Sequence, residues 1–350
     1  MQRTSRKREH IQYAIETGTS GKHGFEDVKF VHNCIPESSM TDASLSTSIG
    51  GLGLSSPILI NAMTGGANET YEINRRLALL AEGAGLAMAV GSQMAALKDP
   101  SVQSSFSVVR EVNPKGIIFA NLGAEATTDQ ALRAVDMIQA DGLQIHLNVM
   151  QELIMPEGDR EFKGVCRQIE NIVKAVSCPV VVKEVGFGMS REAAACLVDL
   201  GIQGIDLGGA GGTNFAEIEN KRRTIPLEML NDWGLTTVQS LLELSSINKV
   251  DKIATGGITN GLEIVKALAL GANLVGMAGF FLRLVTENDL EKCLSVVSRL
   301  HEQVRLIMTA LGVSTIQSIS DVPVVISGVS YHWASMRGID CTYFGQRNRK

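Results

Sequence analysis

The stretch that decides the fold is Cys178-Pro179-Val180-Val181-Val182-Lys183-Glu184-Val185-Gly186. Its β-branched run is short and almost continuously apolar, which is typical of a strand buried on both faces of a parallel sheet. A proline precedes the run and a glycine follows it, and both residues commonly end regular elements. Seven further runs of this kind lie at residues 58–62, 86–90, 117–122, 143–147, 205–207, 253–255 and 274–277.

Amphipathic stretches with helical spacing alternate with these apolar runs. They cover residues 71–84, 102–112, 129–140, 164–176, 191–200, 236–244, 262–270 and 290–311. Eight strand–helix units on a right-handed path close naturally into a barrel, and their even size favours a barrel over a doubly wound open sheet. The sequence therefore predicts an α/β fold, a (β/α)8 TIM barrel at residues 56–311. An irregular N-terminal extension at 1–55 and a C-terminal extension at 312–350 complete the predicted organisation.

Composition narrows the classes of function. The 350 residues contain 32 Lys and Arg against 37 Asp and Glu, and this net charge of −5 argues against general nucleic-acid binding. No apolar run approaches the roughly 20 residues of a membrane span, and no apolar stretch follows the basic N-terminus as in a secretory signal. The six cysteines form no CxxC pair, which predicts reduced thiols, mostly in the core of a cytoplasmic protein, and no zinc site.

Glycines follow the seventh and eighth predicted strands. Gly256 and Gly257 come directly after residues 253–255, and Gly279 comes soon after residues 274–277. Active sites of this fold lie at the carboxyl ends of the strands, and these two strands often bind a phosphate through backbone N–H groups and a helix N-terminus. The alternative is that the glycines only form tight turns. Their occurrence after both strands favours a phosphate site.

Lys183 ends the fifth predicted strand and is expected over the barrel mouth. One interpretation is structural, with the ammonium group paired to a carboxylate such as Glu184. Two chemical roles are also open: a Schiff base formed by a desolvated amine, or a fixed positive charge beside an anion. Thr64, Ser92 and Asn121 follow other strands and offer neutral groups that could bind the edge of a planar ring.

The fourth predicted strand ends in the most distinctive segment, His146-Leu147-Asn148-Val149-Met150-Gln151-Glu152. Alternation places His146 and Asn148 on one face of the strand, and Glu152 is expected in the loop above. One carboxylate with amide and water partners is typical of Mg²⁺ sites in which a substrate phosphate supplies further ligands. A core histidine and a surface ion pair are the alternatives, and the convergence of these residues at one strand end favours function.

The N-terminus carries Arg6, Lys7 and His10. Arg6 and His10 would share one face of a short helix and could clamp a pyrophosphate. A short basic run at a terminus is more often a solvated arm, and by itself this segment favours that interpretation.

Taken together, these motifs resemble one family, the type 2, flavin-dependent isopentenyl-diphosphate delta-isomerases, over nearly the whole chain. Met94 departs from the pattern, because some relatives carry a basic residue after Ser92-Gln93; this argues against a role for the loop in binding a diphosphate. The matching segments are Arg6-Lys7-x-x-His10-Ile11, Asn61-Ala62-Met63-Thr64-Gly65-Gly66, Gly91-Ser92-Gln93, His146-Leu147-Asn148-x-x-Gln151-Glu152, Lys183-Glu184-Val185-Gly186, Gly212-Thr213-Asn214, Gly256-Gly257 and Ala278-Gly279.

The resemblance implies interconversion of isopentenyl diphosphate and dimethylallyl diphosphate in isoprenoid biosynthesis. It further implies reduced FMN, NADPH as reductant, Mg²⁺ and a homo-oligomer, a tetramer or larger. The residues it assigns are Lys183, Gln151 and His146 to catalysis; Glu152 to Mg²⁺; Arg6, Lys7, His10, Asn148 and Gln151 to the substrate diphosphate; and Ala62, Met63, Thr64, Ser92, Asn121, Lys183, Thr213, Gly256, Gly257, Ile258, Ala278 and Gly279 to FMN.

Three other functions are weighed against this one. FMN-dependent 2-hydroxy-acid oxidases place a catalytic His before the seventh-strand glycine pair and an Arg two residues after it, where this chain has Thr255 and Thr259. An enzyme like inosine-monophosphate dehydrogenase needs a cysteine after the sixth strand, and residues 208–228 contain none. A non-catalytic flavin- or phosphate-binding scaffold would not need the polar cluster after the fourth strand.

Overall fold

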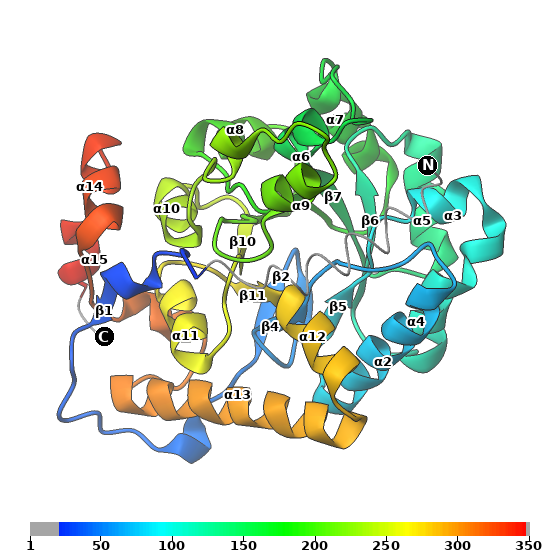
Figure 1. The fold of residues 1–350 in the computed structure, drawn as a ribbon. Helices are drawn as coiled ribbons and strands as arrows, with labels where there is room; N and C mark the ends of the chain where they lie inside the picture. The colour runs from blue at the N-terminus through cyan, green and yellow to red at the C-terminus, as the bar shows by residue number, and fades with distance from the viewer. Residues whose placement is uncertain (1–20, 348–350) are drawn as a thin grey trace.

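The computed structural model describes residues 21–347. Eight parallel strands form a closed barrel in the order β10-β11-β4-β5-β6-β7-β8-β9, with helices around it (Figure 1). Each predicted apolar run overlaps one of these strands, and the predicted (β/α)8 barrel is confirmed. The strands are β4 (Ile58–Ile60), β5 (Ala87–Ala89), β6 (Ile118–Gly123), β7 (Gly142–Leu147), β8 (Val180–Glu184), β9 (Gly204–Asp206), β10 (Asp251–Thr255) and β11 (Leu274–Met277).

The predicted amphipathic stretches all contain helices. These are α2 (Glu69–Ala84), α4 (Ser104–Val112), α5 (Thr128–Met137), α7 (Val165–Ala175), α8 (Arg191–Val198), α10 (Thr237–Glu243), α11 (Gly261–Ala269) and α13 (Leu290–Leu311). Helices that the sequence pattern did not predict lie mainly in the loops after strands, and most of them have only one or two turns, which leave little periodicity to detect. They are α3 (Met94–Lys98), α6 (Val149–Ile154), α9 (Phe215–Lys221) and α12 (Gly279–Glu287), with α14 (Gly328–Met336) and α15 (Thr342–Gly345) in the C-terminal extension.

Local capping chemistry sets several helix ends. At the start of α5, the Thr127 hydroxyl accepts from the Gln130 backbone N–H while the Gln130 side chain accepts from the Thr127 N–H, which is a complete capping box. Asp289 caps α13 through the backbone N–H of Lys292. Gly312 ends that helix at φ 74°, a left-handed conformation that glycine adopts without steric cost.

The barrel interior changes character along the strands. Near the amino end, Leu59, Phe119, Val181 and Ile253 form one buried apolar cluster with Ile49, which comes from the hairpin β2 (Thr47–Ile49) and β3 (Leu52–Leu54). Side chains two residues further along a strand point to the same face. Those positions hold Asn61, Asn121, Lys183 and Thr255, so the carboxyl end of the barrel is polar inside.

The two extensions meet beside the barrel. Strand β1 (Val28–Phe30) pairs antiparallel with β12 (Val324–Ile326), and Val28 lies opposite Ile326. Figure 1 shows this pair at one side of the barrel, close to α11 and α14. Segments near both ends of the described chain therefore lie together at one side of the barrel.

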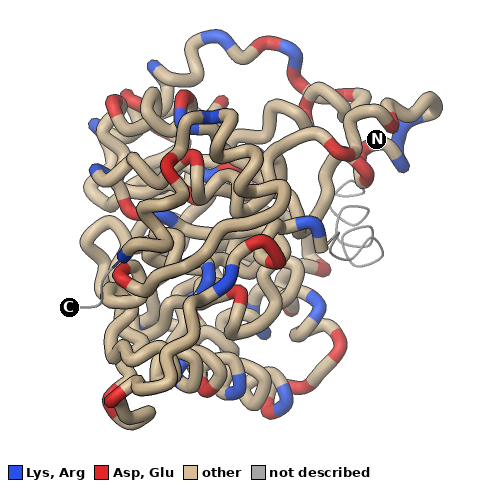
Figure 2. Tube along the Cα trace, turned by 90° about the vertical axis from the view of Figure 1, so that its left-hand side faces the viewer, with Lys and Arg blue, Asp and Glu red and all other residues tan. Residues whose placement is uncertain are grey.

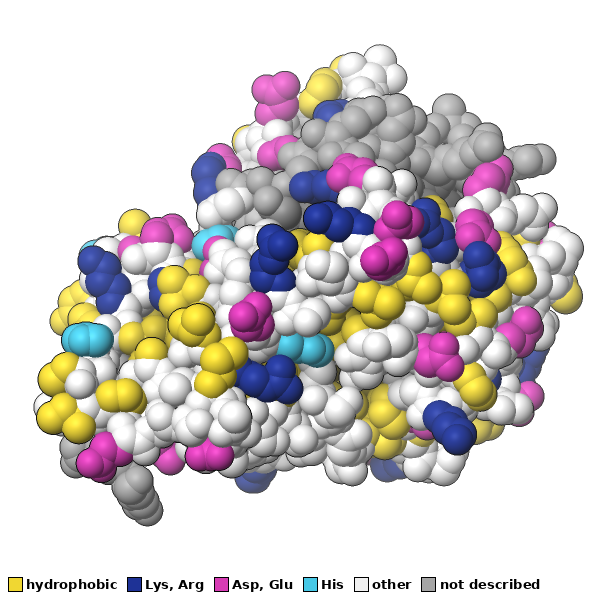
Figure 3. Space-filling view, turned by 90° about the horizontal axis from the view of Figure 1, so that it is seen from below, with side chains coloured by type: hydrophobic (Ala, Val, Ile, Leu, Met, Phe, Trp, Pro, Cys, Tyr) yellow, Lys and Arg dark blue, Asp and Glu magenta, His cyan; other side chains and the backbone are white. Residues whose placement is uncertain are grey.

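Charged residues of both signs are interspersed along the chain (Figure 2), and their side chains are interspersed over the face seen from below (Figure 3). Within residues 21–347, no helix combines the length and apolar character needed to cross a bilayer. The prediction that the cysteines lie mostly in the core is wrong, because Cys293 is buried while Cys34, Cys166 and Cys196 are exposed. Cys166 lies on α7 and Cys196 on α8, both at exposed positions.

Candidate active site

A cavity of about 480 Å³ opens at the carboxyl ends of the barrel strands. Every predicted site residue between positions 21 and 347 lines it, although these residues come from segments throughout the barrel. Arg6, Lys7 and His10 lie outside the described residues. The predicted residues that line the cavity are Ala62, Met63, Thr64, Ser92, Asn121, His146, Asn148, Gln151, Glu152, Lys183, Thr213, Gly256, Gly257, Ile258, Ala278 and Gly279.

The glycines after β10 and β11 form a cradle of main chain that lines the cavity. Gly256 and Gly257 have φ values of 132° and 77°, and a Cβ atom on Gly256 would lie 2.1 Å from the Gly209 carbonyl oxygen. No larger residue fits there without moving the main chain. Gly279 begins the nine-residue helix α12, so the first N–H groups of that helix also face this end of the cavity. Such an arrangement suits a phosphate group.

Lys183 is buried at the end of β8, where its Nζ donates to the Glu184 carbonyl oxygen at 2.9 Å. The Glu184 carboxylate turns to the backbone instead and accepts from the N–H groups of Gly186 at 2.7 Å and Phe187 at 2.5 Å. Burial raises the pKa of Glu184 to about 7, against these hydrogen bonds and the charge of Lys183. From the sequence, an ion pair between Lys183 and Glu184 was one interpretation. In the structure, the Glu184 carboxylate accepts hydrogen bonds from backbone N–H groups instead.

The polar segment after β7 lies along one wall of the cavity. His146 belongs to β7, but the strand ends at Leu147, and Asn148 precedes the short helix α6 that carries Gln151 and Glu152. The expectation of Asn148 on the strand and Glu152 in a loop is therefore wrong, because six residues form a helix too short for a periodic signal. Both side chains still reach the cavity, and the Glu152 Oε1 atom accepts from Asn148 Nδ2 at 2.9 Å.

His146 is held in its neutral form. Burial, together with the positive charge of Lys183, lowers its pKa to about 3. Its Nδ1 lies 2.9 Å from Asn121 Oδ1. At neutral pH, His146 thus brings a hydrogen-bonding group to the cavity rather than a positive charge.

The acidic residues that the sequence analysis missed include Glu125, which lines the cavity, and Glu219, which contacts a residue of its lining. Glu125 lines the cavity just beyond β6, and its pKa is raised by burial and by the negative charges of Glu152 and Asp159. Its place three residues after a predicted strand end was a usable signal. Glu219 on α9 is completely buried and accepts from Gln151 Nε2 at 3.0 Å. No local sequence pattern indicated that pairing, which spans 68 positions.

The carboxylates near α6 suit a divalent cation only in combination with other ligands. Glu152 Oε2 accepts from the Asp159 backbone N–H at 2.8 Å, and Glu125 adds a second carboxylate to the same wall. Among the described residues, no three His, Cys, Asp or Glu side chains converge as a ready-made metal site. A Mg²⁺ ion here would therefore need oxygen ligands from a bound molecule and water, as it often does beside phosphates.

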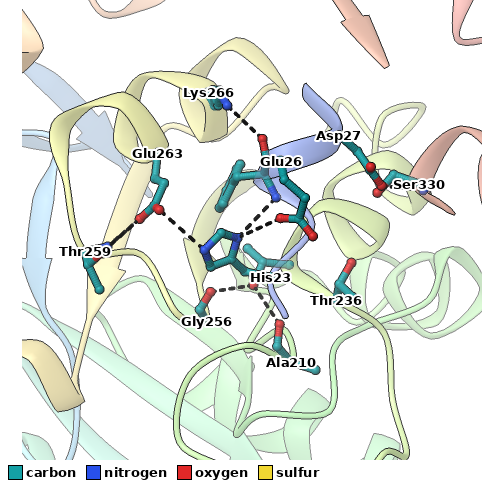
Figure 4. Close-up of polar contacts among 12 residues, drawn as sticks. His23, Glu26, Asp27, Ala210, Thr236, Gly256, Thr259, Glu263, Lys266 and Ser330 are labelled. Carbon is teal, nitrogen blue, oxygen red and sulfur yellow. Dashed lines mark hydrogen bonds and ion pairs between the residues drawn. The ribbon is translucent and has the colours of Figure 1, made fainter. Parts of the chain in front are cut away.

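His23 connects the N-terminal segment to the phosphate cradle (Figure 4). Its Nε2 lies 3.4 Å from Glu263 Oε1, and its Nδ1 accepts from the Phe25 backbone N–H at 3.2 Å. A Cβ atom on Gly257 would lie 3.1 Å from the His23 ring. The imidazole thus packs directly behind the glycine pair, although nothing in the sequence near His23 pointed to the site.

Comparisons with known proteins identify the family. A model of FMN-dependent dehydrogenases matches residues 102–325. Isopentenyl-diphosphate delta-isomerase from Bacillus cytotoxicus is 54% identical over 349 residues, which are 99% of this chain and 100% of that protein. The chain belongs to the isopentenyl-diphosphate delta-isomerase family. Proteins of the same name from Bacillus licheniformis and a Geobacillus species are each 52% identical, again over 99% of this chain and 100% of theirs.

Solved structures share the fold of this isopentenyl-diphosphate delta-isomerase family member at low identity. A mandelate oxidase variant matches with a TM-score of 0.65 at 16% identity, covering 91% of this chain and 96% of that one. A flavocytochrome b2 variant with bound pyruvate matches with a TM-score of 0.68 at 19% identity, covering 91% and 82%. These likenesses establish the barrel alone.

The two positions that would carry oxidase chemistry are occupied by threonines with internal partners. Thr255 Oγ1 accepts from Asn61 Nδ2 at 3.0 Å. The Thr259 N–H donates to Glu263 Oε2 at 2.7 Å, at the start of α11. Neither side chain can act as the general base or the carboxylate-binding cation that a 2-hydroxy-acid oxidase would use there. In this isomerase family member, both threonines serve the local structure of the cradle.

Proposed function

We propose that the chain interconverts isopentenyl diphosphate and dimethylallyl diphosphate, with reduced FMN bound in the cavity. The observation that carries this proposal is the 52–54% identity, over essentially the whole chain, with proteins named for that reaction. The reaction is redox-neutral. One proton joins the terminal alkene carbon, a second leaves the carbon on the other side of the branched centre, and the double bond moves between them.

The cavity offers what FMN requires. The N–H groups around Gly256, Gly257 and Gly279 would hold the phosphate, and the remaining predicted contacts would hold the ribityl chain and the ring. Lys183 would place a fixed positive charge near the ring, where it favours an anionic partner. Reduced FMN supplies an electron-rich ring face and a proton carrier at N5. NADPH as the source of the reducing electrons is part of the same proposal.

The wall formed by β7 and α6 would hold the substrate. Asn148 and Gln151 offer amide N–H groups to a diphosphate, and Glu152 would hold Mg²⁺ against it with Glu125 nearby. Gln151, positioned by Glu219, and His146 would act beside the reacting carbons. Arg6, Lys7 and His10 would close over the diphosphate and exclude water. A cytoplasmic homo-oligomer, a tetramer or larger, is proposed on the resemblance alone.

The main alternative is an FMN-dependent oxidation of a 2-hydroxy acid. Thr255 and Thr259 argue against this oxidation, because they occupy the positions of the oxidase base and arginine and form hydrogen bonds with Asn61 and Glu263. A flavin absorbance spectrum would not separate these two activities, because both enzymes would be yellow. Reduction of the flavin by substrate separates them: a 2-hydroxy acid would pass two electrons to the FMN of an oxidase and bleach it, whereas isopentenyl diphosphate would leave the redox state of the FMN unchanged.

The deciding experiment is an isomerisation assay in D₂O with FMN, NADPH and Mg²⁺, each omitted in turn. We expect deuterium in the dimethylallyl diphosphate formed, and NADPH consumed once per flavin rather than once per product. NADPH loss in step with product would identify an oxidoreductase and would refute the isomerase. Full activity with reduced 5-deaza-FMN would retain the isomerase and refute N5 as the proton carrier.

A further inference from the structure

A chain of hydrogen-bonded side chains crosses the barrel at the floor of the cavity. It runs from Asp206 through Asn61, Gln144 and Asn121 to His146. Gln144 and Asp206 are completely buried, although polar groups in a barrel core are costly unless each finds a partner. These residues lie on or directly after four different strands, and they satisfy one another's hydrogen bonds, which indicates a role beyond packing.

The orientation of the Asn61 amide is fixed by groups whose roles are unambiguous. The backbone N–H of Ala62 can only donate, and it lies 2.8 Å from Asn61 Oδ1. On the other side, Asn61 Nδ2 lies 2.6 Å from an oxygen of Asp206. If the amide oxygen and nitrogen of Asn61 were exchanged, the amide nitrogen would face the Ala62 N–H, and two donors would meet. Asn61 must therefore accept with its Oδ1 and donate with its Nδ2.

This orientation propagates along the chain. Gln144 must donate through Nε2 to Asn61 Oδ1, at 3.1 Å, and must then accept through Oε1. Asn121 Nδ2 donates to that oxygen at 3.2 Å, which turns Asn121 Oδ1 toward His146 Nδ1 at 2.9 Å. An oxygen acceptor at that distance requires a proton on Nδ1.

We propose that Asp206 and the Ala62 N–H, acting through Asn61, Gln144 and Asn121, hold His146 in the tautomer protonated at Nδ1. The Nε2 atom then keeps its lone pair. Burial and the charge of Lys183 favour the neutral ring against a hydrogen bond to the Leu122 backbone, and the chain selects which of the two neutral forms is present. Gln144 and Asp206 are thus positioning residues for His146.

The tautomer has a chemical consequence for the cavity. An Nε2 lone pair accepts a hydrogen bond and cannot donate one to a phosphate oxygen. Beside the reacting carbons, His146 would therefore present a hydrogen-bond acceptor, for example to the O–H group of a bound water, and not a hydrogen-bond donor. Only this last step rests on the proposed function, since the tautomer follows from the protein groups themselves.

Neutron diffraction or ¹⁵N NMR of histidine-labelled, FMN-loaded full-length protein at pH 7 measures the tautomer without any variant. We expect His146 to carry a proton on Nδ1 and none on Nε2. A proton on Nε2 alone, or on both nitrogens, would overturn the proposal. The isomerase assignment would be untouched by that result, because it is judged by the product and NADPH measurements.

A pair of variants tests whether the chain is the cause. Gln144→Met keeps the length of the side chain but breaks the link between Asn61 and Asn121, and we expect a measurable fraction of His146 to shift its proton to Nε2. Gln93→Met is the control. Gln93 is also buried and also contacts Asn121, but it accepts from the Asn121 backbone N–H at 3.0 Å and lies outside the chain. Equal tautomer populations in the two variants would show that the chain does not select the tautomer.

Discussion

His23 Nε2 lies 3.4 Å from Glu263 Oε1, and this contact joins the segment after the N-terminal arm to the helix that follows the phosphate cradle. Burial opposes the charge of Glu263, but hydrogen bonds from His23 and from the Thr259 N–H lower its pKa. The same carboxylate therefore binds the N-terminal segment through one oxygen and the cradle through the other. Glu263 therefore links the position of His23 to the shape of the proposed FMN phosphate site.

We expect His23→Ala to weaken FMN binding. Loss of the ring removes a hydrogen-bonding partner worth about 1 kcal/mol, or roughly fivefold in Kd, and leaves a gap behind Gly257. Titration of the apoprotein with FMN, followed by flavin fluorescence, measures the change. His32→Ala is the control, because His32 is an exposed histidine of the same N-terminal segment. Equal FMN affinity in the two variants would mean that His23 does not support the cradle.

Glu152→Gln tests the proposed Mg²⁺ site. An amide is a poorer Mg²⁺ ligand than a carboxylate, so we expect the Mg²⁺ concentration at half-maximal activity to rise at least about tenfold. FMN affinity should stay within twofold or so, since the predicted flavin contacts lie on other strands. Glu161→Gln is the control, because Glu161 is an exposed carboxylate seven residues beyond the end of α6. An unchanged Mg²⁺ requirement would exclude Glu152 as a ligand.

Glu184 predicts a specific dependence of stability on pH. Its pKa is about 7 in the folded protein against 4.5 as its ordinary value, so the folded state binds the extra proton between these limits. Its contribution to stability is full below about pH 4.5 and is lost as the pH rises through about 7. Glu184→Gln removes this dependence and still offers one oxygen to the two backbone N–H groups.

Denaturant unfolding of both proteins from pH 5 to pH 8 measures the effect. The free energy of unfolding of the unaltered protein, relative to Glu184→Gln, should fall as the pH rises. Glu302→Gln, at an exposed position of α13, controls for the removal of one negative charge. A difference that stays constant over this pH range would contradict the raised pKa.

Cys166 and Cys196 should form a disulfide under mild oxidation. Their Sγ atoms lie 3.7 Å apart on neighbouring helices, and both residues are exposed. Small side-chain rotations would bring the atoms to the roughly 2.05 Å of a disulfide. One equivalent of hydrogen peroxide accepts two electrons from the two thiols and yields the disulfide and two waters.

Thiol counting and peptide mass mapping check this prediction. Two thiols should be lost together, and the peptides with Cys166 and Cys196 should be linked. Cys166→Ser should prevent the loss of the Cys196 thiol, whereas Cys34→Ser should leave that loss unchanged. Separate oxidation of the two cysteines, with no linked peptide, would show that their geometry does not permit the bond.

Deletion of residues 1–10 tests the role assigned to Arg6, Lys7 and His10. We expect a folded protein that binds FMN normally but has a KM for the diphosphate substrate raised at least tenfold or so, because several charge-assisted contacts are lost together. Circular dichroism and flavin titration confirm folding and cofactor binding. Normal substrate kinetics in the truncated protein would show that the segment is a solvated arm.

The sequence by itself determined the barrel and the strand ends that carry its chemistry. Apolar runs such as residues 180–182 are local patterns, and a buried parallel strand leaves the same pattern wherever it lies in a barrel. The fold rule that active sites lie at carboxyl ends then selected Lys183, His146 and the glycine pair at 256–257. Short helices such as α3 and α6 escaped detection, because one or two turns carry little periodicity.

Tertiary structure alone decided how these groups are held. Asn61 and Asp206 are separated by 145 positions, yet closure of the barrel brings them to 2.6 Å, and the tautomer proposed for His146 depends on that contact. The pairing of Gln151 with Glu219 and the packing of His23 behind Gly257 likewise join distant segments. Local patterns cannot encode such partners, because the partner of a buried polar group is chosen by the geometry of the closed barrel and by the cost of leaving that group unsatisfied.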